Sequence, residues 1–392
     1  MINIAFTGGG TGGHIYPGLA VAERLKQLLL GVDARIFWIG SSSGMDQKLV
    51  EEAGIEFFGV PSGKLRRYFS LKTVTDFFKV LAGFFAARKI LKKQKAHLLF
   101  SKGGFVSVPP CAAAASLNIP VFTHESDFSP GLATKINVRF VMRTGGMVFT
   151  AYEDTKKLFG HKLLKKGLND RVTVTGNPVR SIFNNADAVK GRAFLGLPAN
   201  GSERVLLVLG GSQGAQEINE LVRAALPELM ELYTVAHQTG PNLSWDVPAS
   251  EKYKPYPYIK EEMPHVMAAA ELVMGRSGAG IWEWAYLGKP MLLIPLRGSG
   301  TRGDQVENAR YFEKAGAAQA LLPSDGSESI SADRLILAVK TFALDVEKRE
   351  AYASSSLRIG KHADGIDCGG AEKIARILYN KINTFSFNEE DK

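Results

Sequence analysis

The chain has 392 residues and a formal net charge of +9, and 45% of its residues are hydrophobic. This size predicts two domains, each with a core of ordinary size. Cys111 and Cys368 are the only cysteines, which excludes a disulfide framework or a cysteine zinc cluster and fits a reducing cytoplasm. No charged segment followed by an apolar run opens the sequence, and no apolar stretch reaches the roughly 18–20 residues that span a bilayer. We therefore expect a protein that is soluble or peripheral to a membrane.

The first half of the sequence alternates short apolar segments with segments of helical spacing. Residues 2–7 predict a buried strand, a glycine-rich turn follows at 8–13, and residues 16–30 have the apolar spacing of a helix. This alternation predicts a parallel α/β sheet. Later strands are expected at 34–39, 97–101 and 120–123, with a helix between the last two.

The same pattern restarts in the second half, with a strand at 204–209, a glycine turn, and a helix at about 215–229. Further strands are expected at 232–237, 272–274 and 291–295. We therefore predict two similar doubly wound halves that meet near 177–200, where Asn-Pro and Pro-Ala-Asn-Gly interrupt the periodicity. The predicted divisions are 1–180, 181–365, and a C-terminal helix with a frayed polar tail at 366–392.

The turn at residues 8–13 is placed where an open α/β sheet binds ligands, beyond the carboxyl end of a strand. Glycines allow a ligand to approach the backbone, and the following helix amides and helix dipole favour an anion. Gly8, Gly10 and Gly13 satisfy the G-x-G-x-x-G pattern. The second strand, however, is followed by I-G-S-S-S-G in place of the acidic residue that holds a ribose, so NAD binding is not expected.

Three glycine or polar turns in the second half have a similar placement. Ser212 in G-G-S-Q-G could donate to a phosphate or cap a helix, or do both. Glu283, after the turn at 275–280, could bind a ribose or simply favour the helix dipole. Asp304 and Gln305 open another helix and could bind sugar hydroxyls or act as capping residues.

Seven motifs in register resemble the MurG family of glycosyltransferases, and they extend from residue 7 to about residue 318. The motifs are G-G-T-G-G-H-I-Y-P-G-L-A-V-A at 9–22, S-K-G-G-F-V-S-V-P at 101–109, H-E-S-D at 124–127, G-N-P-V-R at 176–180, G-G-S-Q-G-A at 210–215, H-Q-T-G at 237–240 and R-G-D-Q-x-x-N-A at 302–309. Two details depart from the common family pattern. Many members have H-E-Q-N at 124–127, and they place one more residue between Arg276 and Glu283, which affects the contacts expected of Ala279.

The resemblance implies a GT-B architecture, in which two Rossmann-like domains face a cleft. It implies an inverting transfer of N-acetylglucosamine from UDP-N-acetylglucosamine to lipid I, which gives lipid II for peptidoglycan synthesis. The donor would lie mainly on the second half and the acceptor on the first. The implied donor contacts are Arg180 and Ser212 at the diphosphate, Ile259 at the uracil, Glu283 at the ribose, and Ala279, Asp304 and Gln305 around the sugar; the implied acceptor-side residues are Thr11, Gly12, Gly13, His14 and Asp127.

The transfer needs a base for the acceptor hydroxyl and stabilisation of the leaving diphosphate. His14 is the best candidate base because its ordinary pKa is near neutrality, although it could instead be a structural donor. Glu125, paired with His124, is the competing base. Arg180 and the amides after Gly211 would stabilise the diphosphate. Because the sequence lacks a D-x-D pair, we expect no essential metal, and we expect no cofactor.

Residues 62–95 combine many basic residues with aromatic ones, which is typical of an interfacial membrane contact. Alternatively, a helix could pack its phenylalanines on the sheet and leave its lysines solvated. RNA binding could use the same composition, but no nucleic-acid motif is present and no such partner is expected. The residues concerned are Lys64, Leu65, Arg66, Arg67, Tyr68, Phe69, Lys72, Asp76, Phe77, Phe78, Lys79, Phe84, Phe85, Arg88, Lys89, Lys92, Lys93 and Lys95.

These features predict a peripheral enzyme on the cytoplasmic face of the bacterial membrane, bound to an anionic surface. Two other classes of function remain open. Another GT-B enzyme, such as a UDP-N-acetylglucosamine 2-epimerase, would share the donor site but need no membrane face. A non-enzymatic sensor would bind the nucleotide sugar without turnover.

Overall fold

The computed structural model describes residues 1–10, 12–42, 46–63, 71–160, 163, 167–211, 213–241, 243, 250–298, 301–323, 329–361 and 369–390, without the side chains of 71–74 and 385–390. The chain forms two compact units. The first comprises Met1–Arg180 and Cys368–Lys392, and the second comprises Ser181–Asp367.

The first unit is a seven-stranded parallel sheet in the order β3-β2-β1-β4-β5-β6-β7. The order of the strands changes direction between the neighbouring strands β1 and β4. This position is the topological switch point, where sheets of this kind bind ligands. Its strands are β1 (Ile2–Thr7), β2 (Ala34–Ser41), β3 (Glu56–Val60), β4 (Ala96–Ser101), β5 (Val121–Glu125), β6 (Val148–Thr150) and β7 (Val172–Val174); its main helices are α1 (Gly12–Leu28), α2 (Asp46–Glu52), α3 (Leu71–Lys93), α4 (Val108–Ser116), α5 (Leu132–Thr144) and α14 (Gly370–Glu390).

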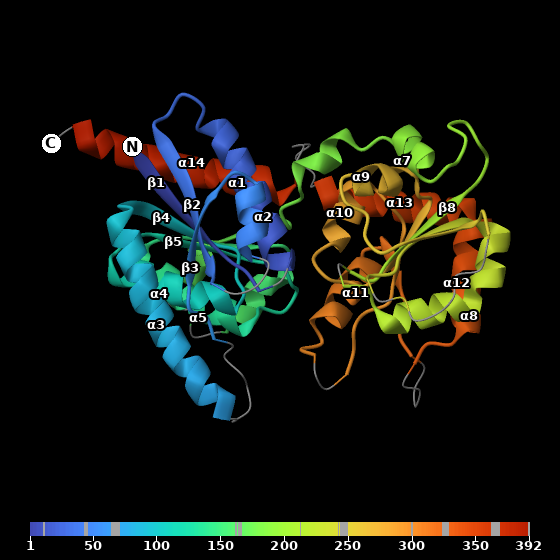
Figure 1. Ribbon diagram of the computed structural model, residues 1–392, viewed down its shortest axis with the longest axis horizontal. Helices are drawn as coiled ribbons and strands as arrows, with labels where there is room; N and C mark the ends of the chain where they lie inside the picture. Colours follow the sequence, from blue (N-terminus) through green and yellow to red (C-terminus); the bar gives the residue numbers. More distant parts are fainter. Residues whose placement is uncertain are drawn as a thin grey trace. The chain divides into compact units, whose positions relative to one another are not determined.

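Alternating side chains of the first sheet face two separate cores. Ile4 and Phe6 of β1 pack with α1 and α14 on one face, whereas Ala5 packs with α3, α4 and α5 on the other. This alternation is the period of two expected of a strand that is buried on both faces. Figure 1 shows α14, at the red end of the colour bar, running beside the blue strands and α1.

An ion pair joins α1 to α14 across most of the sequence. Arg24 donates from Nε to Glu372 Oε2 at 2.7 Å, and Glu372 is buried. The C-terminal helix therefore completes the first unit. Residues 366–392 were predicted as a separate C-terminal segment with a frayed polar end, whereas α14 extends to Glu390.

The second unit repeats this topology in a six-stranded parallel sheet, in the order β10-β9-β8-β11-β12-β13. Counted from β8, its six strands follow the same order as the strands β1 to β6 of the first unit. The strands are β8 (Val205–Leu209), β9 (Thr234–Gln238), β10 (Tyr253–Tyr256), β11 (Leu272–Gly275), β12 (Met291–Leu293) and β13 (Ala318–Ala320); the helices are α7 (Ala188–Phe194), α8 (Gln216–Leu232), α9 (Met263–Ala269), α10 (Ile281–Tyr286), α11 (Asp304–Lys314), α12 (Ala332–Leu344) and α13 (Val346–Lys361).

The repeated parallel sheets were predicted from the apolar spacing, although the sequence missed several strands and placed some boundaries inaccurately. The helix expected from Tyr16 begins at Gly12, so it includes the end of the glycine turn. The strands β3, β6, β7, β10 and β13 were not predicted. Each is five residues or shorter, and a short strand carries too few alternating residues to give a clear periodic signal.

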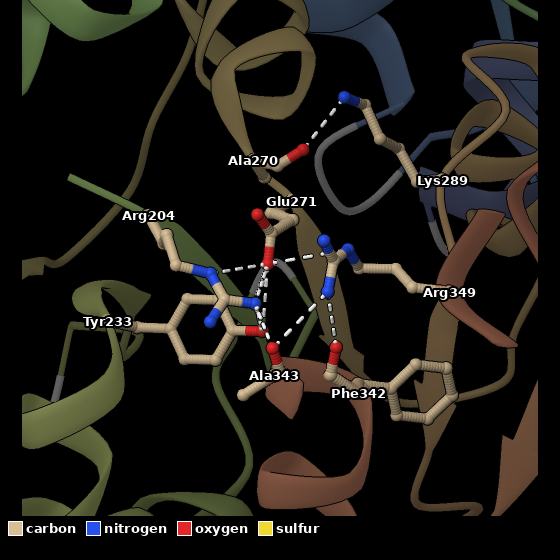
Figure 2. A network of polar contacts seen from close by, with 8 residues as sticks. All are labelled: Arg204, Tyr233, Ala270, Glu271, Lys289, Phe342, Ala343 and Arg349. Carbon is tan, nitrogen blue, oxygen red and sulfur yellow. Dashed lines mark hydrogen bonds and ion pairs between the residues drawn. The ribbon is translucent and has the colours of Figure 1, made fainter. Parts of the chain in front are cut away.

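A polar network closes the amino-terminal edge of the second sheet, away from the strand ends that bear the glycine turns (Figure 2). Glu271, just before β11, accepts hydrogen bonds from Arg204 Nε at 2.8 Å and from the Tyr233 hydroxyl at 3.1 Å. Arg204 and Arg349 also donate to the last carbonyls of α12, at Ala343 and Phe342, both at 2.7 Å. The network therefore attaches the end of α12 to the sheet.

We predict that Glu271→Ala lowers the free energy of unfolding by about 2–3 kcal/mol, because Arg204 and Tyr233 lose a charged acceptor. Urea denaturation measures this loss. Glu203→Ala is the matched control, since Glu203 pairs with Arg192 but is itself 42% exposed, against 27% for Glu271, and its loss should cost less than about 1 kcal/mol. Equal effects of the two substitutions would show that the network adds nothing to an ordinary surface pair.

Candidate functional site

The carboxyl edge of the first sheet gathers the glycine turn, His14 and the H-E-S-D segment. Gly8 and Gly10 have φ angles of +154° and +86°, which a glycine adopts readily. A Cβ on Gly9 would lie 2.0 Å from Asp46 Oδ2. Glycine is therefore required here by close packing, and the turn leads directly into the first turn of α1, where Gly12, Gly13 and His14 lie.

Asp46 fixes this turn from the neighbouring helix α2. Its carboxylate accepts from the amide of Gly10 at 3.1 Å and from the amide of Ser41 at 3.3 Å. Burial raises the pKa of Asp46, and these two hydrogen bonds oppose the rise. The sequence prediction overlooked Asp46, although an acidic residue soon after β2 was the available signal. Its carboxylate is committed to the protein backbone.

The His14 ring lies against a second glycine turn, which follows β4. Gly103 and Gly104 have φ angles of +88° and +77°. A Cβ on Gly104 would lie 3.0 Å from His14 Cδ2 and 2.7 Å from the carbonyl oxygen of Gly9. The half-buried imidazole therefore depends on the absence of a side chain at Gly104.

Glu125 is buried, and both of its carboxylate oxygens accept backbone hydrogen bonds. Oε1 accepts from the amide of Asp127 at 3.0 Å, and Oε2 accepts from the amide of Gly131 at 2.9 Å. The carboxylate thus holds the turn between β5 and α5. Glu125 therefore has a structural role in addition to any catalytic one. Asp127 lies in the same turn and is half-buried.

His124 and Arg180 occupy different places on the first unit. His124 Nε2 lies 3.0 Å from the carbonyl oxygen of Gly176. Burial and the charge of Lys102 lower the pKa of His124 well below its ordinary value. The guanidinium carbon of Arg180 lies 5.1 Å from the centroid of the Tyr16 ring, which is a cation–π contact at the start of α1. Thr11 lies outside the described residues.

The carboxyl edge of the second sheet carries the remaining predicted residues. Gly211 and Gly214 have φ angles of +95° and +76°, and α8 follows from Gln216. Ser212 lies outside the described residues. Gln238, at the end of β9, donates to the Gly211 carbonyl at 3.1 Å and accepts from the amide of Ile259 at 3.0 Å. Gln238 therefore connects the glycine turn to the segment that holds Ile259.

Gln305 and Asp304 lie in the first turn of α11, and Ala279 and Glu283 lie close to the start of α10. Gln305 Oε1 accepts from the amide of Leu296 at 2.9 Å, and its backbone carbonyl accepts from the hydroxyl of Ser277 at 2.7 Å. Asp304 forms an ion pair with Arg302 at 2.8 Å. Gln305 thus lies beside the turn that precedes α10, while its Nε2 lies 3.9 Å from the position that a Cβ of Gly278 would take.

Two arginines that the sequence prediction missed meet one carboxylate at this edge. Glu217, in the first turn of α8, lies 2.8 Å from Arg276 and 2.5 Å from Arg297. The three charges sum to +1, and the arginines lie on the segments after β11 and β12. This group therefore adds positive charge near the glycine turn. The sequence carried no clear signal for either arginine, because Arg276 and Arg297 both lie outside the seven motifs.

His237 of the H-Q-T-G motif has a structural position in β9. Its Nδ1 lies 3.0 Å from the Tyr253 hydroxyl, and burial lowers its pKa to about 4. Within the described part of the chain, no group of three or more His, Cys, Asp and Glu residues could hold a metal ion.

Comparisons with known proteins identify the family. The glycosyltransferase family 28 N-terminal domain matches residues 4–145, and the corresponding C-terminal domain matches residues 205–366. A protein of Treponema denticola named UDP-N-acetylglucosamine--N-acetylmuramyl-(pentapeptide) pyrophosphoryl-undecaprenol N-acetylglucosamine transferase is 47% identical over 410 residues, which cover 99% of each chain. A protein of the same name from Staphylococcus carnosus is 40% identical over 352 residues, covering 89% of this chain and 92% of that protein.

The chain belongs to this transferase family. Among solved structures, Acinetobacter baumannii MurG matches with a TM-score of 0.68 and 23% identity, covering 97% of this chain and all of that one. A UDP-GlcNAc 2-epimerase from Neisseria meningitidis, bound to UDP-GlcNAc, matches with a TM-score of 0.63 and 16% identity over similar shares. These structural matches confirm the GT-B fold class, and the family matches identify the enzyme as a glycosyltransferase.

We predict that Gly104→Ala lowers transferase activity by roughly 10-fold or more, because the methyl group displaces the His14 ring. Steady-state kinetics measure the change. Gly31→Ala is the matched control, since Gly31 has a similar φ of +84° but nothing within 4 Å of the added Cβ. Gly31→Ala should lose about 1–2 kcal/mol of stability through backbone strain, and Gly104→Ala should lose at least as much, because its Cβ also meets the Gly9 carbonyl oxygen at 2.7 Å. Equal activity of the two variants would contradict a role for the space above Gly104.

Proposed function

We propose that the chain transfers N-acetylglucosamine from UDP-N-acetylglucosamine to the muramyl 4-hydroxyl of lipid I with inversion, forming lipid II for peptidoglycan synthesis. The observation that carries this proposal is the 47% identity to a named transferase over 99% of both chains. The epimerase alternative is not favoured, because the epimerase match is one of fold at 16% identity. Membership of a transferase family also argues against a non-enzymatic sensor.

The second unit is the proposed donor domain. Its glycine turn precedes the amino terminus of α8, and the Arg276–Glu217–Arg297 group adds positive charge at the same edge. Both features suit a diphosphate. Ser212 and Arg180 remain proposed diphosphate contacts, and Glu283 remains the proposed ribose contact. The amide of Ile259 already bonds Gln238, so we assign the uracil contact to other atoms of Ile259.

The sugar of the donor would contact Gln305 and its neighbours. The oxygen of the Gln305 side chain is bound to the Leu296 amide, which directs the amide nitrogen as the donor to a sugar hydroxyl. Asp304 and Ala279 complete this proposed subsite. The proposed reaction includes no step that uses a metal or a cofactor.

The first unit is the proposed acceptor domain, with His14 as the general base. Its ring is half-buried at the amino end of α1, beside Gly12 and Gly13, and an imidazole is the side chain best suited to accept a proton near neutral pH. The structural hydrogen bonds of Glu125 support His14 over Glu125, because both oxygens of the Glu125 carboxylate already accept the backbone amides that hold the turn. Asp127 and Thr11 remain proposed acceptor contacts.

We predict that His14→Ala lowers kcat by roughly 10²–10⁴ while UDP affinity stays unchanged. The assay incubates the protein with labelled UDP-N-acetylglucosamine and a lipid I analogue, followed by product analysis and by titration of UDP. Glu125→Gln is the comparison, and it should mainly lower stability. An unchanged kcat of His14→Ala would assign the base to Glu125, and a wild-type protein that binds UDP without forming product would contradict the proposed transfer.

The outer face of α3 is the proposed membrane contact. Phe77, Phe78 and Phe85 are 59%, 62% and 60% exposed, whereas Phe84 is half-buried and packs on the core beneath. The packing alternative therefore holds for Phe84. The described basic residues along the segment are all exposed: Lys79, Arg88, Lys89, Lys92, Lys93 and Lys95. Lys64, Leu65, Arg66, Arg67, Tyr68 and Phe69 lie outside the described residues, as does the side chain of Lys72.

Within the described residues, no helix has both the length and the apolar content to cross a membrane. Exposed aromatics beside lysines support binding to an anionic surface instead. We infer that this surface is the cytoplasmic face of the cell membrane, because the lipid acceptor is membrane-bound and the donor is a soluble nucleotide sugar.

We predict that Phe77→Ser combined with Phe85→Ser weakens binding to vesicles containing anionic phospholipid at least about 10-fold, because each buried phenylalanine contributes roughly 1.5–3 kcal/mol. Co-sedimentation with vesicles measures the binding. The control pair is Leu337→Ser with Leu344→Ser, two leucines of α12 that are even more exposed. Similar losses for both pairs would contradict a contact specific to α3.

A further inference from the structure

Lys102 is a buried lysine at the carboxyl edge of the first sheet, directly after β4. Its side chain is 1% exposed, and its backbone amide donates to the Thr7 carbonyl at 2.8 Å. The ammonium donates to the hydroxyl of Ser126, which in turn donates to Asn177 Oδ1 at 2.8 Å. One cation therefore joins the segments that follow β4, β5 and β7.

The charge of Lys102 is compensated from a distance. Glu125 and Asp127 flank Ser126 and stabilise the ammonium electrostatically. Burial lowers the pKa of Lys102 to about 8, and the two carboxylates oppose this change. The lysine is therefore held in an environment that disfavours its charged form.

Stability of the fold does not explain a buried lysine at this position. Taking a charge out of water costs free energy, and an apolar residue of similar length would often serve the fold as well or better. Local conflicts of this kind concentrate at functional sites. Lys289 in the second unit shows the contrast, because this half-buried lysine donates to the carbonyls of Ala268 and Ala270 at 2.7 and 2.8 Å and so caps the end of α9. Figure 2 shows its bond to Ala270.

Lys102 also lies next to the glycine turns that surround His14. A Cβ on Gly8 would lie 3.1 Å from Lys102 Cβ and 3.0 Å from the carbonyl oxygen of His14. Two residues after Lys102, Gly104 lies under the His14 ring. Lys102 thus connects the backbone beneath His14 with the turn that carries Glu125, Ser126 and Asp127.

We propose that Lys102 is a positioning residue for the transfer reaction, whose ammonium holds the Glu125–Asp127 turn beside His14 without touching the substrate. This inference rests on the proposed transfer function. When the ammonium loses its proton, the turn loses its buried positive charge, and the hydrogen bond to the Ser126 hydroxyl loses the charge that strengthens it. Use of the acceptor should therefore decline as the pH rises past about 8, while donor binding on the second unit continues.

Other charged groups face this region and must be separated from Lys102. They are His14 from α1, Asp46 from α2, and His124, Glu125 and Asp127 from β5 and its turn. The pKa of His124 lies well below its ordinary value, so His124 does not cause an alkaline decline. Stability changes in the opposite direction from activity. Since the folded pKa of Lys102 is lower than the unfolded value, stability should rise with pH from about 8 toward 10.5.

The test compares Lys102→Met with Lys289→Met, the same substitution at a half-buried lysine of the second unit. Lys102→Met should lower kcat/KM for a lipid I analogue roughly 10- to 100-fold, with unchanged UDP affinity and no alkaline decline near pH 8. Lys289→Met should lower the midpoint of thermal unfolding and keep the wild-type pH profile of activity. Ser126→Ala, which retains the lysine and removes its acceptor, should lower acceptor kcat/KM in the same direction.

Wild-type acceptor kinetics with a wild-type alkaline decline in Lys102→Met would overturn the proposal. Should Lys102→Met fail to fold, Ser126→Ala decides, and unchanged acceptor kinetics in that variant would also overturn it. A wild-type enzyme that forms no product fails the proposed function itself, and this outcome is distinct from a wild-type enzyme that is active beside an equally active Lys102→Met.

Discussion

Close approach of backbone segments at the carboxyl edges of two parallel sheets is the constraint on which the rest of the structure depends. In the first unit, a side chain at Gly9 would meet Asp46, and one at Gly104 would meet both His14 and the Gly9 carbonyl. In the second unit, a Cβ on Gly214 would lie 2.1 Å from the Thr239 carbonyl oxygen. Glycine at these positions allows loops from neighbouring strands to touch, so that polar groups from distant parts of the sequence converge.

The two units use the same sheet topology for different electrostatic environments. At the edge of the first sheet, one buried lysine lies among three carboxylates and two imidazoles. At the edge of the second sheet, two arginines share a single carboxylate. The first environment suits the movement of a proton, whereas the second suits an anion. The shared topology therefore does not determine the chemistry, which depends on the residues placed after each strand.

The sequence predicted the parallel sheets and the turns after β1 and β8 well, because apolar runs followed by glycine are local signals. It did not reveal the relations among residues that are distant in sequence. Glu125 was a candidate base by residue type, and its two amide partners became visible only once the β5–α5 turn was formed. Lys102 was part of a recognised motif, but its burial and its link to Ser126 depend on three strands meeting at one edge.

The return of α14 to the first unit has a consequence for the order of folding. Ile374, Leu378 and Ile382 belong to the core that also contains Ile4 and Phe6. The ribosome synthesises the whole of Ser181–Asp367 before it makes these residues. The second unit can therefore acquire its complete core during synthesis, whereas the first unit must wait with the apolar surface that α14 later covers, beside α1, exposed to water. This interval makes α14 a natural point of vulnerability to aggregation and of recognition by chaperones.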